Sequence, residues 1–283
     1  MNLTVGLSIS ESPDLERLGF GTVHLQDAMV EFARYLLAGG VTLAYGGDLR
    51  QGGFTQILFE LLETHRYAGG DPLNRIVNAL AWPSYLKLKK TDQARLKQIA
   101  KFQRIGPPAD VVIDVEQFLP PDSTENRYIW ARCLTHMREY MNQTIDVRLV
   151  LGGTLQGYNG KYPGLAEEAY LALQDQKPLF LIGAFGGCAK AIIDALEGGS
   201  PEGLSKKFQL QDVNYAELLR YYNDRIKQSP IDYSNLLMFF RKQGVRGLNN
   251  GLTEEENRRL FETPHIPEMI MLVLKGLRTI SAE

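Results

Sequence analysis

Short apolar runs alternate with longer amphipathic segments over residues 1–200. Near-continuous apolar runs of this length are typical of strands that are buried on both faces of a parallel sheet. The predicted strands cover residues 3–10, 41–47, 74–83, 109–115, 147–153 and 178–185. We therefore expect an α/β fold, with a Rossmann-like parallel sheet of about six strands and helices on both faces.

The segments between these strands repeat apolar residues at helical spacing. The clearest stripe belongs to the segment 24–40 and consists of Leu25, Ala28, Met29, Phe32, Ala33, Leu36 and Leu37. Gly39 and Gly40 then end the segment, as glycines commonly do at helix C-termini. The predicted helices of this part of the chain are 24–40, 52–68, 91–102, 124–143, 163–173 and 187–199.

The strand–helix alternation stops after residue 200. Four helical patterns follow with no strand between them, at residues 214–226, 232–244, 252–262 and 266–280. We place a domain boundary near residue 205, with a sheet domain at 1–205 and a helical C-terminal extension at 206–283. We expect this extension to pack on the sheet domain or on a partner. Its apolar stretches are expected to form core or oligomer contacts, and we expect a homo-oligomer.

Composition excludes several classes of protein. Among 283 residues, 44% are hydrophobic and 23% are charged, and the net charge is -2, so no basic field for nucleic acid is present. No segment reaches the ~18 consecutive apolar residues that a membrane span needs. The N-terminal residues lack a basic, apolar signal pattern, and Cys133 and Cys188 stand far apart in apolar contexts. We expect a cytoplasmic protein with packed thiols, and neither a metal site nor a resident cofactor.

Three predicted strands end in paired glycines, at Gly46-Gly47, Gly152-Gly153 and Gly186-Gly187. The carboxyl ends of parallel strands share one edge of the sheet, and ligands of open α/β folds bind there. Each glycine pair precedes a helix, whose first N–H groups favour an anion. The pairs therefore indicate a pocket for a phosphate-bearing ligand, although a tight turn alone also needs glycine.

The first of these turns, "YGGDLRQGGFT", carries further polar groups. Arg50 adds a charge and Thr55 a hydroxyl, while Gly52 and Gly53 open the helix that follows. Asp48 could bond a ribose hydroxyl or simply cap the turn. The spacing departs from the G-x-G-x-x-G fingerprint, so we do not expect nicotinamide redox chemistry.

The long helix at 124–143 supplies arginines beside its apolar stripe. On a helical wheel, Arg127 and Arg138 lie close to the stripe that Trp130, Leu134, Met137 and Met141 form, and Arg132 lies on the opposite side. An arginine at the rim of a buried face either extends to water or meets an anion.

The stretch that begins at His136, "HMREYMNQTIDVRLVLGGTLQGYNGKYPGLAEEA", resembles the SLOG superfamily of DprA-like and LOG-like Rossmannoid domains. LOG proteins combine an arginine-rich helix with the motif P-G-G-x-G-T-x-x-E. Arg138 matches the arginine, Gly152-Gly153 match the paired glycines, and Gly164 with Glu168 match the second half. In LOG enzymes this arginine and this glutamate act in hydrolysis of a nucleotide N-glycosidic bond.

This chain departs from the LOG motif at Leu151, which replaces the proline, and at Leu165, which replaces the threonine. Its loop is also longer, by "TLQGYNGKYP". The longer loop, the turn "YGGDLRQGGFT" and the helical tail are similar to the SLOG domains related to TRPM channels and to SLOG modules of bacterial antiviral systems. The latter resemblance implies sensing of NAD-derived or ADP-ribose-like signals.

The resemblance and the glycine positions lead to two hypotheses. The first is a sensor that binds a nucleotide-derived small molecule and acts on a separately encoded effector. The second is an enzyme that cleaves an N-glycosidic bond in a nucleotide or NAD, with Glu168 and Arg138 as catalytic residues. A third reading makes the protein an assembly module that binds through its helical tail.

Lys161 is expected to hold phosphate together with Arg138. Glu167 and Glu168 either contact the ligand or only complement the helix dipole behind Pro163. The expected ligand-binding residues are Ser10, Gly46, Gly47, Asp48, Arg50, Gly52, Gly53, Phe54, Thr55, Gly152, Gly153, Lys161, Pro163, Gly164, Glu167, Gly186 and Gly187.

Overall fold

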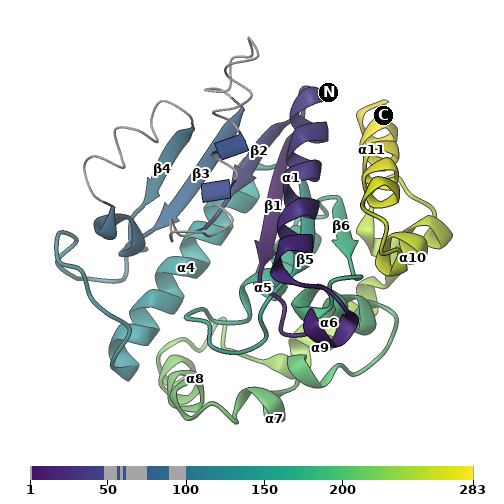
Figure 1. The fold of residues 1–283 in the computed structure, drawn as a ribbon. Coiled ribbons are helices and arrows are strands. Elements are labelled where there is room, and N and C mark those ends of the chain that lie inside the picture. Colours follow the sequence, from purple (N-terminus) through teal and green to yellow (C-terminus); the bar gives the residue numbers. More distant parts are fainter. Residues whose placement is uncertain (1, 48–55, 58–59, 62–74, 89–99, 283) are drawn as a thin grey trace.

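A parallel sheet of six strands forms the centre of the protein (Figure 1). The computed structural model describes residues 2–47, 56–57, 60–61, 75–88 and 100–282. The strands are β1 (Thr4–Ser10), β2 (Thr42–Tyr45), β3 (Ile76–Ala81), β4 (Lys101–Ile105), β5 (Val147–Gly152) and β6 (Leu179–Ile182). The expected Rossmann-like α/β fold is therefore confirmed.

The order of the strands is β4-β3-β2-β1-β5-β6. From β1 the chain moves outward through β2, β3 and β4, and it then returns to place β5 on the other side of β1. The register pairs Thr4 with Thr42 on one side and Ser10 with Gly152 on the other. The direction of the winding thus changes between β1 and β5, which is where open α/β sheets bind their ligands.

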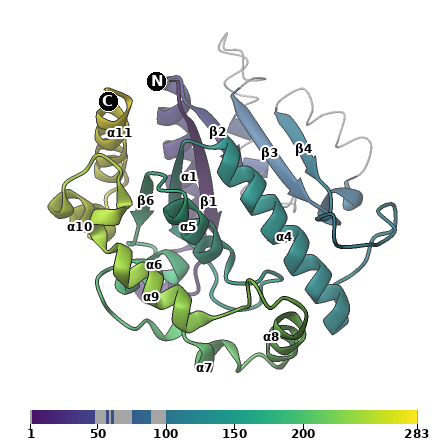
Figure 2. The ribbon, with the colours of Figure 1, turned by 180° about the vertical axis from the view of Figure 1, so that it is seen from behind.

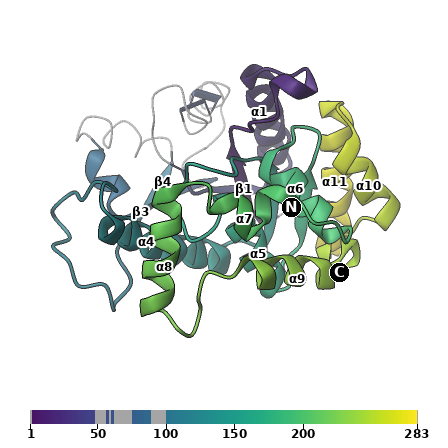
Figure 3. The ribbon, with the colours of Figure 1, turned by 90° about the horizontal axis from the view of Figure 1, so that it is seen from below.

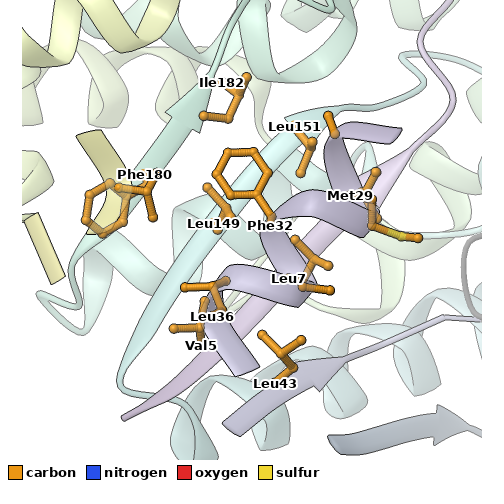
Figure 4. Close-up of a cluster of buried hydrophobic side chains, with 14 of the residues drawn as sticks. Val5, Leu7, Met29, Phe32, Leu36, Leu43, Leu149, Leu151, Phe180 and Ile182 are labelled. Carbon is orange, nitrogen blue, oxygen red and sulfur yellow. The ribbon is translucent and has the colours of Figure 1, made fainter. Parts of the chain in front are cut away.

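Helix α1 (Thr22–Ala38) covers one face of the sheet, beside α11 (Ile266–Ala282) (Figure 1). Its buried residues are the seven that the helical spacing predicts. Figure 4 shows Phe32 and Leu36 over the aliphatic side chains of β1 and β5, among them Leu7. A fully buried side chain of this kind contributes ~1.5–3 kcal/mol, so this layer is a main source of stability.

The opposite face is covered by α4 (Thr124–Thr144) and α5 (Gly164–Gln174), which lie in front when the molecule is seen from behind (Figure 2). Met141 of α4 packs against Ala44 of β2. Helix α6 (Gly187–Leu196) follows β6 and packs beside α5. The helix predicted at 124–143 is confirmed to within one residue at its end.

The strand predicted at 109–115 is wrong. The fourth strand is β4, which pairs with β3 through Val77 and Lys101, while Val112 in the predicted segment is 94% exposed. Because β4 lies at the edge of the sheet, it tolerates the polar sequence "KFQRI", which hides it from a search for apolar runs. The residues near Val111 instead pack as a loop on Trp82. The helix predicted at 91–102 lies mostly outside the described residues, and its end belongs to β4.

The C-terminal helices pack on the sheet domain and share its hydrophobic clusters. Helix α8 contacts α4, and α9 contacts α5 and α6 (Figure 3). These helices are α7 (Lys206–Gln209), α8 (Val213–Arg225), α9 (Tyr233–Gln243), α10 (Glu254–Glu262) and α11. The domain boundary near residue 205 stays a prediction.

A group of tyrosine hydroxyls joins the loop before α5 to these helices. Tyr233 of α9 lies at the centre, with its hydroxyl 2.7 Å from that of Tyr158 in the loop and 2.7 Å from that of Tyr215 in α8. Tyr215 also donates to the carbonyl oxygen of Lys161 at 2.6 Å. The long loop is thus held by side chains of the C-terminal extension.

No helix in the described part of the chain has the length and apolar character that a bilayer span requires. The apolar patterns of the tail therefore serve packing at α9 and α11, where Phe240 and Leu277 are fully buried.

Gly276 offers a test of how closely α11 approaches the sheet. A Cβ atom there would lie 2.4 Å from the carbonyl oxygen of Asn250 and 2.7 Å from the ring of Phe180. We expect Gly276→Ala to lower the free energy of unfolding by ~1–3 kcal/mol, even though alanine favours a helix by ~1 kcal/mol. Urea denaturation measures this, with Arg278→Ala at an exposed position of the same helix as the control. Equal stability of Gly276→Ala and the parent would contradict the tight contact.

Candidate functional site

The carboxyl ends of β1 and β5 are joined by hydrogen bonds at the point where the strand order reverses. Gly153 N–H donates to the carbonyl oxygen of Ser10 at 2.8 Å, and Thr154 N–H donates to the Ser10 hydroxyl at 3.3 Å. Ser10 therefore sets the path of the chain as it leaves β5, and it lies where a ligand of this fold would bind.

The structure brings the paired glycines together on this edge. Cys188 N–H donates to the carbonyl oxygen of Gly153 at 2.9 Å, so the turns after β5 and β6 touch. A Cβ atom on Gly187 would lie 2.4 Å from that same oxygen, and Gly187 has a φ of 63°. Gly46 lies at the end of β2, where a Cβ atom would lie 2.5 Å from the sulfur of Met141. These glycines are required by close packing of the turns, whatever they contribute to a ligand.

Part of the predicted site falls on residues that the structure does not describe. The turn after β2 is described as far as Gly47. The predicted residues outside the described ranges are Asp48, Arg50, Gly52, Gly53, Phe54 and Thr55.

Arg138 points from α4 toward the start of α5 and is 8% exposed. Its Nη1 donates to Glu167 Oε2 at 2.5 Å. A Cβ atom on Gly160 or on Gly164 would lie 2.7 or 2.8 Å from the guanidinium nitrogens. The guanidinium thus fits into a space that two glycines leave open, directly beside the N-terminus of α5.

Glu168 is the centre of a buried network of charges. Its Oε2 accepts from the Ser8 hydroxyl and, at 3.1 Å, from Arg148 Nη1. Arg148 Nη1 also lies 2.8 Å from the Ser8 oxygen, and Arg138 Nε lies 3.6 Å from Glu168 Oε1. Two guanidinium groups and a hydroxyl therefore fix one carboxylate under the site.

The sequence analysis did not find Ser8 or Arg148. Arg148 is fully buried in the middle of β5, inside the run "VRLVLG". A charged residue inside a strand that is covered on both faces requires a buried partner. The position of Arg148 in an apolar run was therefore the signal that could have revealed this network. Burial lowers the pKa of Arg148, while the charge of Glu168 opposes that shift.

Glu167 does more than complement the dipole of α5. Its Oε1 accepts from the Thr135 hydroxyl at 2.5 Å, while Oε2 pairs with Arg138. Both carboxylates of the pair are buried, at 2% exposed for Glu167 and 6% for Glu168. The two carboxylates therefore share Arg138 of α4, and Glu167 also binds Thr135 of the same helix.

The structure does not bring Lys161 and Arg138 to one cavity. Lys161 Nζ donates to the Ser229 hydroxyl at 2.8 Å, in a cavity of about 390 Å³ that Glu167 also lines. Arg138 does not line this cavity. Glu167 therefore stands between the two cations that were expected to hold one phosphate.

The N-terminus of α6 already holds an anion from the protein. Asp14, in the loop after β1, accepts from Gly187 N–H at 2.8 Å. A Cβ atom on Gly186 would lie 2.6 Å from Asp14 Cβ, so this glycine lets the loop close on the helix. In contrast, no side chain of the described residues caps α5 behind Pro163.

The two cysteines are buried thiols. Desolvation by burial raises the pKa of Cys133 and of Cys188 to about 12, so neither is a thiolate at neutral pH. Within the described residues, no group of three or more metal-binding side chains is present.

Together, the sheet and the charges at its switch point define a Rossmann-like α/β protein with a polar centre at its carboxyl edge. The sequence model of the family described as SLOG cluster2 matches residues 1–260, so the chain belongs to this family of the SLOG superfamily. The predicted membership of that superfamily is therefore confirmed. No curated protein matches the chain in sequence.

Arg148→Met tests the buried network. The substitution leaves the carboxylate of Glu168 without its innermost cation, so we expect the free energy of unfolding to fall by ~3 kcal/mol or more. In a Glu168→Gln background the same change should cost ~1–3 kcal/mol less, because the charge it strands is gone. Urea denaturation of the four proteins measures the coupling, and Arg34→Met on the surface of α1 is the control. Equal costs in both backgrounds would show that Arg148 and Glu168 act independently.

Proposed function

We propose that this protein binds a nucleotide-derived ligand, similar to ADP-ribose, cyclic ADP-ribose or NAD, at the carboxyl edge of its sheet. Membership of the SLOG superfamily supports a nucleotide-related ligand or a glycosidase-like reaction. The switch point between β1 and β5 supports the position. The finer identity of the ligand, and a role in antiviral signalling, extend this proposal by analogy.

The buried network of Arg138, Glu167, Glu168 and Arg148 is the observation that carries the proposal. Charged groups lose hydration when they are buried, and apolar residues of the same size are commonly as stable. Within the described residues, Arg138 Nε and Arg148 Nη2 also have no hydrogen-bond partner. A costly polar cluster at the ligand edge of the fold is typical of a functional site.

The geometry assigns different parts of the ligand to different groups. A phosphate fits best at the N-terminus of α5, where the N–H groups from Gly164 onward and the Arg138 guanidinium are close together. The start of α6 is less suited, because Asp14 already binds there. Oε2 of Glu168 is engaged by Ser8 and Arg148, which leaves Oε1 for a ribose hydroxyl.

Ser10 and the glycine turns at the strand ends keep their predicted roles in this proposal and form the floor of the pocket. The ligand contacts of Asp48, Arg50, Gly52, Gly53, Phe54 and Thr55 stay predictions, because these residues lie outside the described ranges. Homo-oligomerisation, a separately encoded effector and a cytoplasmic location stay predictions.

Hydrolysis of an N-glycosidic bond is the second candidate. The carboxylate of Glu168 is held by two guanidinium groups in a fixed position, which suits it to stabilise an oxocarbenium-like transition state. The same position serves binding equally well. Binding is the leading candidate, because both neighbouring carboxylates already bind guanidinium and hydroxyl groups of the protein.

Ligand binding is measured by thermal shift and calorimetry with ADP-ribose, cyclic ADP-ribose, NAD and AMP. We expect at least one of them to stabilise the parent protein. Arg138→Gln and Glu168→Gln should weaken its affinity ~10–100-fold, since each loses a charge-assisted hydrogen bond. The matched controls are Arg34→Gln and Glu255→Gln, both exposed and far from the edge. Each shift is compared with the same variant without ligand, which separates affinity from stability.

Mass spectrometry of the same mixtures separates binding from catalysis. Free base or nicotinamide that forms with the parent and with Glu255→Gln, but not with Glu168→Gln, would establish the hydrolase. Stabilisation without product would establish the binding protein. If no compound stabilises the parent and no product forms, both candidates are contradicted.

A further inference from the structure

A cavity lies outside the carboxyl-edge site, on the outer side of α4 and α5. It has a volume of about 390 Å³ and is closed by α8 and by the connection from α8 to α9. This volume is within the ~300–1,000 Å³ of small-molecule sites. Its walls include Thr135, Glu167 and Tyr170, but not Arg138 or Glu168.

Lys161 brings a buried cation to this cavity. The side chain is 8% exposed, and Nζ donates to the carbonyl oxygen of Ser229 at 3.1 Å and to its hydroxyl at 2.8 Å. An ammonium group has three donors, and both of these acceptors are neutral. Among the described residues, no carboxylate lies within 4 Å of Nζ, so Lys161 forms no direct ion pair. The charges of Glu167 and Glu139 act on it from a longer distance.

Glu139 brings the opposite charge, from a more exposed position on α4. Its carboxylate forms no hydrogen bond or ion pair with any residue in the described ranges. Glu139 and Lys161 line the same cavity without meeting each other. The cavity thus separates two charges of opposite sign that the protein leaves unmatched.

The other main charges around the cavity are already matched. Arg132 binds Asp110, in the loop before α4, through two hydrogen bonds of 2.8 Å. Glu167 pairs with Arg138 and Thr135. Asp232 caps the first turn of α9. Lys161 and Glu139 are therefore the charged side chains of the cavity that we assign to a ligand.

Aromatic rings complete the cavity. Lys161 Nζ lies 5.4 Å from the ring centre of Tyr162 and 5.8 Å from that of Tyr222. Tyr170 lines the same space from α5. These rings offer an apolar wall beside the two charges.

We propose that this cavity binds a small zwitterion of the amino-acid type, with its carboxylate on Lys161, its ammonium on Glu139 and its side chain against the tyrosines. This site is distinct from the proposed nucleotide site, although Glu167 forms part of the wall between the two. We do not expect a nucleotide in this cavity, because its phosphates are anions and would meet the negative charge of Glu139 as well as the cation of Lys161.

The protonation of the two residues agrees with this arrangement. Burial lowers the pKa of Lys161, against the charges of Glu167 and Glu139. Partial burial and the nearby Glu167 raise the pKa of Glu139. Both groups are thus displaced toward their neutral forms, and a zwitterion supplies to each the counter-charge that reverses its shift.

The test uses the full chain and the free L-amino acids, added one at a time at millimolar concentration in thermal shift and calorimetry. We expect saturable binding of a subset that includes aromatic or aliphatic members. For the best of them, the decarboxylated amine and the deaminated acid should each bind at least about tenfold more weakly. This comparison uses only the parent protein, so it does not depend on how a variant folds.

Variants then assign the two charges. Lys161→Met should weaken binding of the amino acid by about 30-fold or more, since it removes the buried partner of the ligand's carboxylate. Glu139→Gln should weaken it by about tenfold, since Glu139 is exposed and water screens its charge. The exposed residues Lys207 and Glu255 serve as controls, as Lys207→Met and Glu255→Gln. Binding of ADP-ribose or NAD should persist in Lys161→Met, which keeps this result separate from the nucleotide proposal.

Three outcomes would overturn the proposal. No amino acid binds, or the deaminated acid binds as tightly as the amino acid itself, or Lys161→Met weakens binding of the nucleotide and not of the amino acid. The last result would return Lys161 to the carboxyl-edge site.

Discussion

The carboxylate of Glu168 is the interaction on which the centre of this structure depends. It joins Ser8 of β1 to Arg148 of β5, which lies 140 residues later in the chain, and to Arg138 of α4. In a buried position, charge–charge interactions are weakly screened, so the loss of one partner leaves a large uncompensated energy. The network therefore fixes the start of α5 relative to β1 and β5, and any ligand at this edge meets a prearranged set of charges.

Most of the fold could be predicted from the sequence, because burial on both faces gives β1, β2, β3, β5 and β6 their continuous apolar character. Helix α1 was predictable residue by residue, since only one of its faces meets the sheet. Strand β4 was not, because an edge strand has one neighbour and can be polar. The segment near Val111 was wrongly predicted as a strand, because its residues are apolar although they pack on Trp82 as part of a loop.

The candidate site was predictable in its position but not in its chemistry. Glycines at the strand ends indicate the carboxyl edge, and the resemblance to a known superfamily singles out Arg138 and Glu168. Ser8 and Glu168 are 160 residues apart in the sequence, and Asp14 and Gly187 are 173 residues apart. No spacing along the chain therefore reveals these two contacts. Lys161 belongs to the same loop as the expected phosphate site, yet its side chain binds Ser229 in the connection between α8 and α9. A local sequence motif could not predict this contact, because Ser229 belongs to the tail.

The tyrosine hydroxyls around Tyr233 connect the long loop before α5 to α8 and α9. A loop held in this way has no stable shape of its own without the helices that anchor it, and those helices lose polar partners without the loop. The loop and the tail therefore pack as one unit. Shortening either of them removes polar partners of the other, so the two segments have to be redesigned together.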